Sequence, residues 1–97
     1  MSVAIVFFAD KTTELFFRTG QVKKVGWSNV KAIVARKLDM VHYASVLSDL
    51  KSPPGNRLEA LSGNRIGYHC IRVNDKWRVI FRWTDSGPTE VDVSDYH

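Results

Sequence analysis

The sequence has little of several features that define common protein classes. Its 97 residues include one cysteine, Cys70, so no internal disulfide can form, which fits a reducing compartment. We interpret Cys70 as a small buried strand residue rather than a reactive thiol. No apolar run is long enough to span a bilayer, and the run near the start lacks the basic flank of a signal peptide. We therefore expect a cytoplasmic protein without membrane contact.

Familiar metal and nucleotide motifs are also missing. His42, His69 and Cys70 lack a recognised ligand spacing, so we expect no metal and no cofactor. The segment "PPGN" is a turn and not a phosphate-cradling glycine loop. We interpret His42, on an expected helix, and His69, in an expected strand, as packing or surface residues.

The pattern of the first half predicts one strand followed by two helices. The length suits a single domain, 1–97, and an apolar share of 44% suits a packed core. The short apolar run 3–8 predicts a buried strand. Residues 10–20 predict a helix that begins at Asp10 or Thr12 and ends at Gly20.

A second and longer helix is expected from Ser28 as N-cap to the "KSPPGN" segment, where two prolines end it. Apolar residues at helical spacing form its buried stripe: Val30, Ile33, Val34, Leu38 and Val41.

After that break the period changes to that of strands. The runs 67–73 and 77–83 flank the short turn "NDK", and 89–96 predicts a last strand. The expected order is β-α-α-β-β-β, an α+β plan with helices on one side of a mostly antiparallel sheet. In the run 77–83, Arg78 shares a face with Ile80 and Arg82. A charge there needs a rim, a partner or a ligand, and spacing alone does not decide between a structural ion pair and a functional contact.

Basic residues dominate the charge balance, with 14 Lys and Arg against 10 Asp and Glu, which favours an acidic partner such as nucleic acid. A basic loop and helix surface could track a phosphate backbone, although an ordinary solvated helix face explains it equally well. Its members are Lys23, Lys24, Lys31, Arg36 and Lys37.

The chain ends in "EVDVSDYH", which raises the question of a site at the last strand. Asp95 and His97 would share a face with the valines before them, whereas Tyr96 would point to the other face. A carboxylate beside an imidazole suits acid–base work. Spacing alone nevertheless favours a solvated polar tail.

Three segments in combination change that balance: "PPGNRLEAL", "IRVNDKWRVIFRW" and the terminal "DYH". Together they resemble the HigB family of toxins within the RelE/ParE superfamily, close to its GraT-like branch. The resemblance implies a RelE-like fold and a metal-independent, ribosome-dependent endoribonuclease that cuts mRNA in the A site of the small subunit. It also implies a HigA-type helix-turn-helix antitoxin, and we expect the toxin alone to be monomeric.

Site residues follow from the resemblance by position. Asp95, Tyr96 and His97 match the catalytic end of the family, and Arg78 matches its strand arginine, expected at the scissile phosphate. The sequence departs from the family where some members have a His and a Lys, because it has Glu59 and Ser62 there.

That departure leaves the handling of the phosphate open. Glu59 could act as a base or only add negative charge, and Arg57 or Arg65 could replace the missing lysine's charge. Two other functions also stay open: a ParE-like gyrase poison of the same fold, and a non-enzymatic module that binds RNA or an antitoxin.

Overall fold

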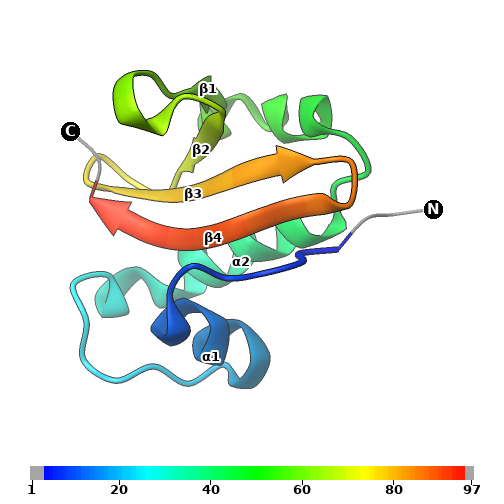
Figure 1. Cartoon of the computed structure of the whole chain (residues 1–97). Helices are drawn as coiled ribbons and strands as arrows, with labels where there is room; N and C mark the ends of the chain where they lie inside the picture. The colour runs from blue at the N-terminus through cyan, green and yellow to red at the C-terminus, as the bar shows by residue number, and fades with distance from the viewer. Residues whose placement is uncertain (1–3, 96–97) are drawn as a thin grey trace.

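A computed structural model describes residues 4–95, in which two α-helices cover one face of a four-stranded sheet (Figure 1). The strands lie in the order β1-β2-β3-β4, and each neighbouring pair is antiparallel. The predicted α+β class is therefore confirmed. The elements are α1 (Lys11–Thr19), α2 (Lys31–Tyr43), β1 (Glu59–Ala60), β2 (Tyr68–Arg72), β3 (Trp77–Thr84) and β4 (Gly87–Asp95).

Helix α1 begins and ends as its sequence predicts. The carboxylate of Asp10 accepts hydrogen bonds from the backbone N–H of Thr13 at 3.1 Å and from its hydroxyl at 2.7 Å. Gly20 adopts a left-handed conformation with φ 76°, and its N–H donates to the carbonyl of Phe16 at 2.8 Å. One side-chain cap and one glycine thus fix both ends.

The second helix is shorter than predicted. Residues 28–30 form a 3₁₀ turn, and the Ser28 hydroxyl donates back to the Val25 carbonyl, so Ser28 is not the N-cap of α2. At the other end Ala44 is extended, and a separate 3₁₀ turn covers 47–51. The Asp49 carboxylate accepts from two backbone N–H groups of 45–46, which offers that segment an alternative to helix.

The N-terminal run is not the buried strand that its composition predicts. Within 4–9 it forms only an isolated parallel bridge between Phe8 and Val91. Val6 and Phe7 have 58% and 59% of their surfaces exposed. The run lies beside β4 at the edge of the sheet, so one of its sides has no further strand to pair with.

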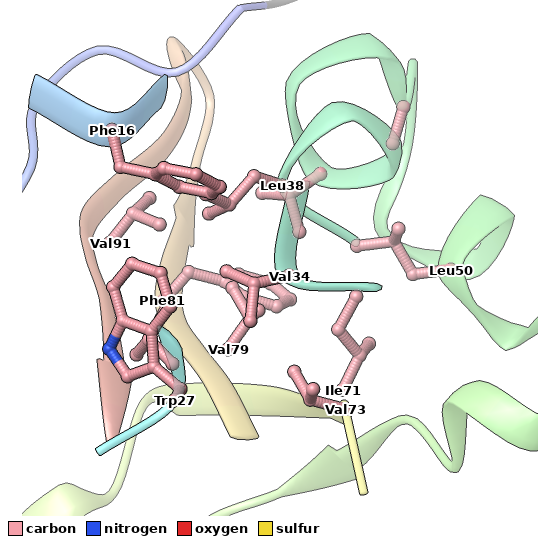
Figure 2. Packing of buried hydrophobic residues seen from close by; sticks show 13 residues of the cluster. Phe16, Trp27, Val34, Leu38, Leu50, Ile71, Val73, Val79, Phe81 and Val91 are labelled. Atoms are coloured by element: carbon pink, nitrogen blue, oxygen red, sulfur yellow. The ribbon is translucent and has the colours of Figure 1, made fainter. Parts of the chain in front are cut away.

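The core fills the space between the helices and one sheet face. Val79 and Phe81 of β3 are fully buried, and Figure 2 shows them converging with Val34, Leu38 and Val91. The predicted alternation along β3 is therefore confirmed. Burial of each such side chain contributes about 1.5–3 kcal/mol.

The connection between α1 and α2 passes very close to the start of β3. A Cβ atom added at Gly26 would lie 2.4 Å from Cζ2 of Trp77, closer than real Cβ contacts come. Glycine is therefore required at this point for the connection to pack against the tryptophan ring.

Candidate functional site

The sheet face away from the helices, here called the open face, carries polar and charged side chains. Paired residues of β2, β3 and β4 point to the same face of the sheet, and successive residues of a strand alternate between the two faces. Arg72 lies opposite Arg78, which lies opposite Ser94. The open face comprises Tyr68, Cys70, Arg72, Arg78, Ile80, Arg82, Asp92 and Ser94.

Arg78 is held by backbone carbonyls near the β2–β3 turn. Its Nη1 donates to the carbonyl of Asn74 and, at 3.1 Å, to that of Trp77. Among residues 4–95 no carboxylate lies within ion-pair distance of its guanidinium. Its neighbour Arg72 differs, because it pairs with Asp75. Arg78 thus keeps a charge that is oriented but not neutralised by an acid of the described chain, which suits binding of a phosphate.

Asp95 lies at the same end of the sheet as Arg78 but on the helix-side face. It stands opposite Trp77, and its carboxylate lies 3.9 Å from Nζ of Lys76 (Figure 1 shows this end of β4 beside the β2–β3 turn). The shared face with Val91 and Val93 agrees with the sequence prediction. Tyr96 and His97, the other two predicted catalytic residues of the chain end, lie outside the described residues.

One acid on the same face as Arg78 is Asp92, which the sequence did not single out. It lies opposite Ile80 and accepts a hydrogen bond from the Ser94 hydroxyl at 3.0 Å. Burial raises the pKa of the Asp92 carboxyl, while the Ser94 bond and the charge of Arg65 act in the other direction. A strand alternation traced across β3 and β4 could have found it.

A second group on the open face surrounds Tyr68. The phenol donates to Oε1 of Glu90 at 2.8 Å, and this bond raises the pKa of the Tyr68 hydroxyl. The guanidinium carbons of Arg65 and Arg82 lie 5.8 and 6.0 Å from the ring centroid. The sequence predicted a role for Arg65 alone among these four residues.

The remaining residues predicted to contact phosphate lie in the segment from Arg57 to Arg65, at the β1 edge of the sheet. Arg57 has a left-handed backbone with φ 48° and is exposed. Glu59 lies on the edge strand β1 opposite Cys70, and Ser62 is the N-cap of the 3₁₀ turn Gly63–Arg65. Of these four predicted residues, Arg65 is the one that contacts the Tyr68 ring.

The predicted basic surface is mostly exposed, with one exception. Lys37 donates to Oδ1 of the fully buried Asn56 at 2.5 Å, and burial lowers the pKa of its ammonium group. This bond gives Lys37 a structural contact that the sequence did not indicate. The exposed members are Lys23 and Lys24 between the helices and Lys31 and Arg36 on α2.

The cysteine and one histidine agree with their predicted packing roles. Cys70 is 1% exposed, and burial raises the pKa of its thiol to about 11. His42 accepts a hydrogen bond at Nδ1 from the backbone of Ile5 and packs against Phe17 with ring centroids 5.0 Å apart. Within 4–95 no group of three potential metal ligands gathers. In the same range no helix has the length and apolarity needed to cross a membrane.

Comparison with known proteins adds the family. A model of HigB-like toxins, described as RelE-like toxins of the type II toxin-antitoxin system HigB, matches residues 6–97. This chain belongs to the HigB-like toxin family. It is 41% identical over 78 residues to Toxin HigB-1 of Vibrio cholerae, covering 80% of this chain and 82% of that protein. An uncharacterized protein of Haemophilus influenzae is 34% identical over 79 residues, or 81% and 78% of the two chains.

Solved structures agree with this HigB-like chain at the level of fold. The YoeB-YefM complex from Staphylococcus aureus has a TM-score of 0.58 at 15% identity and is covered over 99% of its chain, with all of this chain aligned. The YoeB/ParE toxin from Agrobacterium tumefaciens has a TM-score of 0.51 at 20% identity, with both chains covered completely. The RelE-like fold predicted from the resemblance is therefore confirmed.

Proposed function

We propose that this HigB-like toxin is a ribosome-dependent endoribonuclease that cleaves mRNA in the A site and thereby stops translation. The observation that carries the proposal is Arg78: a strand arginine oriented by two carbonyls, without a carboxylate partner among residues 4–95, at the end of the sheet from which Asp95 projects. Family membership supplies the toxin class.

RNA provides its own nucleophile, the 2′-hydroxyl, so the protein has to position groups and handle charge. Arg78 would bind the scissile phosphate and stabilise the charge that develops on it. Asp95 and His97 would transfer the protons of the attacking and leaving oxygens, and Tyr96 would stack on a base or bond the phosphate. Arg57, Glu59, Ser62 and Arg65 would line the approach of the strand. The chemistry assigns no step to a metal or cofactor.

Partners follow from the same proposal. The exposed cations Lys23, Lys24, Lys31 and Arg36 would contact ribosomal RNA of the small subunit, and Lys37 would contribute charge from its site beside Asn56. A HigA-type helix-turn-helix antitoxin would neutralise the toxin in the cytoplasm. A gene for such a protein beside this one would support the pairing.

The deciding experiment is translation-coupled mRNA cleavage by wild type, Arg78→Ala and His97→Ala, with Arg18→Ala as matched control. Arg18 is an exposed arginine of α1 paired with Glu14, outside the proposed site. We expect Arg78→Ala to lose about hundredfold or more in cleavage, because a preorganised donor to the transition state is removed. His97→Ala should also lose cleavage, and Arg18→Ala should match wild type.

The products and the dependence on ribosomes test the rest. Attack by the 2′-hydroxyl predicts 2′,3′-cyclic phosphate ends, so ordinary 5′-phosphate ends would refute that mechanism. Equal cleavage of naked RNA would remove the ribosome from the proposal. DNA damage in expressing cells without mRNA cleavage would favour a gyrase poison, and toxicity retained by the His97 and Asp95 variants would favour a non-enzymatic module.

A further inference from the structure

The Tyr68 ring is fixed by charged groups from three different parts of the chain. Its hydroxyl is bonded to Glu90 of β4, Arg82 approaches from β3, and Arg65 approaches from the turn after β1. The ring itself is only half-buried. Two positions earlier in the chain, Ile66 leaves 78% of its surface exposed. A half-buried aromatic ring that three charged side chains hold in place suits contact with a flat ligand.

The backbone is strained where it supports this ring. Glu90 has φ 52°, a conformation that side-chain-bearing residues rarely adopt, and it lies at the register shift between β3 and β4. Such strain persists where the surrounding structure requires it and is common at binding sites. Here the irregularity accompanies the contact between the Glu90 carboxylate and the phenol.

The Tyr68 group is separate from the proposed phosphate site. Arg82 lies four residues beyond Arg78 on β3, a distance of about 13 Å along a strand. The Arg78 guanidinium turns back to the carbonyls of Asn74 and Trp77, toward the β2–β3 turn. One phosphate therefore cannot contact both arginines.

We propose that Tyr68, Arg65 and Arg82 form a second nucleotide position, in which a base of single-stranded mRNA that flanks the cut stacks on the phenol ring. This inference rests on the proposed nuclease function. Aromatic rings and arginines are the usual platform for unpaired bases, and stacking tolerates different bases because each has a π-face. The position would align the strand so that the scissile phosphate reaches Arg78.

The charge of the group favours a base over an acidic protein segment. Glu90 is bonded to the phenol, and Asp92 lies close enough to interact with Arg65. These acids offset the two arginines, so the group lacks the uncompensated positive charge that an acidic partner would seek. A neutral base needs no such excess.

The test compares Tyr68→Leu, which removes the ring, with Tyr68→Phe, which keeps it, in translation-coupled cleavage mapped along one mRNA. Tyr43→Leu is the matched control, because Tyr43 is 68% exposed on α2 and outside both sites. We expect Tyr68→Leu to cleave about tenfold more slowly, with a loss that differs between cut sites according to the flanking base. Tyr43→Leu should keep the wild-type rate and map, whereas Tyr68→Phe, which keeps the ring but loses its bond to Glu90, should lose less than Tyr68→Leu.

Several outcomes would overturn the inference. A folded Tyr68→Leu protein with the wild-type rate and map would do so, as would an equal loss in Tyr68→Phe. A weakened antitoxin complex with an unchanged cleavage map would assign the ring to a protein partner instead.

A crosslinking arm separates this inference from the nuclease proposal. Ribosome-bound mRNA carrying 4-thiouridine beside the A-site codon should crosslink to the Tyr68 peptide in the His97→Ala background. The crosslink should disappear when Tyr68→Leu is added. If the crosslink forms but wild type does not cleave mRNA, the base-stacking position is supported and the nuclease function is rejected. If wild type cleaves but no crosslink forms, only the base-stacking position is rejected.

Discussion

The two faces of β3 differ: one packs into the core under the helices, and the other carries the arginines of the proposed sites on either side of the buried Ile80. On one face Val79 and Phe81 are fully buried under the helices. On the other, one residue along, Arg78 and Arg82 point away from them. A side-chain period of two therefore lets a single strand supply the core and the candidate site at once. Stability and the proposed function should therefore be separable by substitutions at adjacent positions of β3.

The largest expected effect comes from a substitution on the helix-side face of β3. Phe81→Ala should lower the free energy of unfolding by about 3–5 kcal/mol, because it leaves a cavity at a fully buried position. Its neighbour Arg82→Ala is the matched control and should change that free energy by at most about 1 kcal/mol, since Arg82 is exposed and loses only its contact with the Tyr68 ring. Urea unfolding of both variants measures the contrast, and similar losses would refute the division between the faces.

A smaller effect concerns Cys70, which is buried within the open face. The folded protein keeps the thiol proton until about pH 11, whereas the ordinary pKa is 9.0. This contribution to stability is therefore complete below pH 9 and declines as the pH rises toward 11, by at most about 1.4 kcal/mol per pH unit. The advantage of wild type over Cys70→Ala in the free energy of unfolding should shrink over that range. A constant difference up to pH 11 would contradict the burial argument.

The smallest expected effect concerns the hydrogen bond between Tyr68 and Glu90 on the open face. Glu90→Gln removes the carboxylate whose hydrogen bond raises the pKa of the Tyr68 hydroxyl, so that pKa should fall toward its ordinary value of 10.0. Ultraviolet absorbance of the phenolate, taken as the difference from Tyr68→Phe, measures it. The change in unfolding free energy should stay within about 1 kcal/mol. An unchanged titration would show that Glu90 does not control the phenol.

The parts of the fold that repeat a period were predictable from the sequence. The alternation 77, 79, 81, 83 gave the correct core face, and Asp10 with Gly20 gave the ends of α1. The prediction of a buried strand for the apolar run 3–8 was wrong. Composition indicates a preference for strand, but it does not show whether the strand has neighbours on both sides. The long helix was predicted to continue to the "KSPPGN" segment because the prolines there are the first residues that must end it. It ends earlier, and the Asp49 side chain binds the backbone N–H groups just after it.

Some features of the candidate site follow from a local sequence pattern, whereas others depend on contacts between residues far apart in the chain. Arg78 was a candidate from the sequence because a charge in an apolar strand is visible there, and its role at the phosphate came from the family resemblance and stays a prediction. Asp92 and the Tyr68–Glu90 contact depend on strand register and on a bulge, and the Lys37–Asn56 bond joins residues 19 positions apart. A two-residue strand such as β1 carries no period at all, so it could not be predicted.

The tight passage at Gly26 has a mechanical consequence. The lysines at 23 and 24 sit just before the glycine that rests on Trp77, and Trp77 immediately precedes Arg78. The contact at Gly26 thus ties the segment that carries the lysines to the start of the strand that carries Arg78. Under the proposed function, Gly26 would therefore fix the distance between the lysines that contact ribosomal RNA and the arginine that contacts the scissile phosphate.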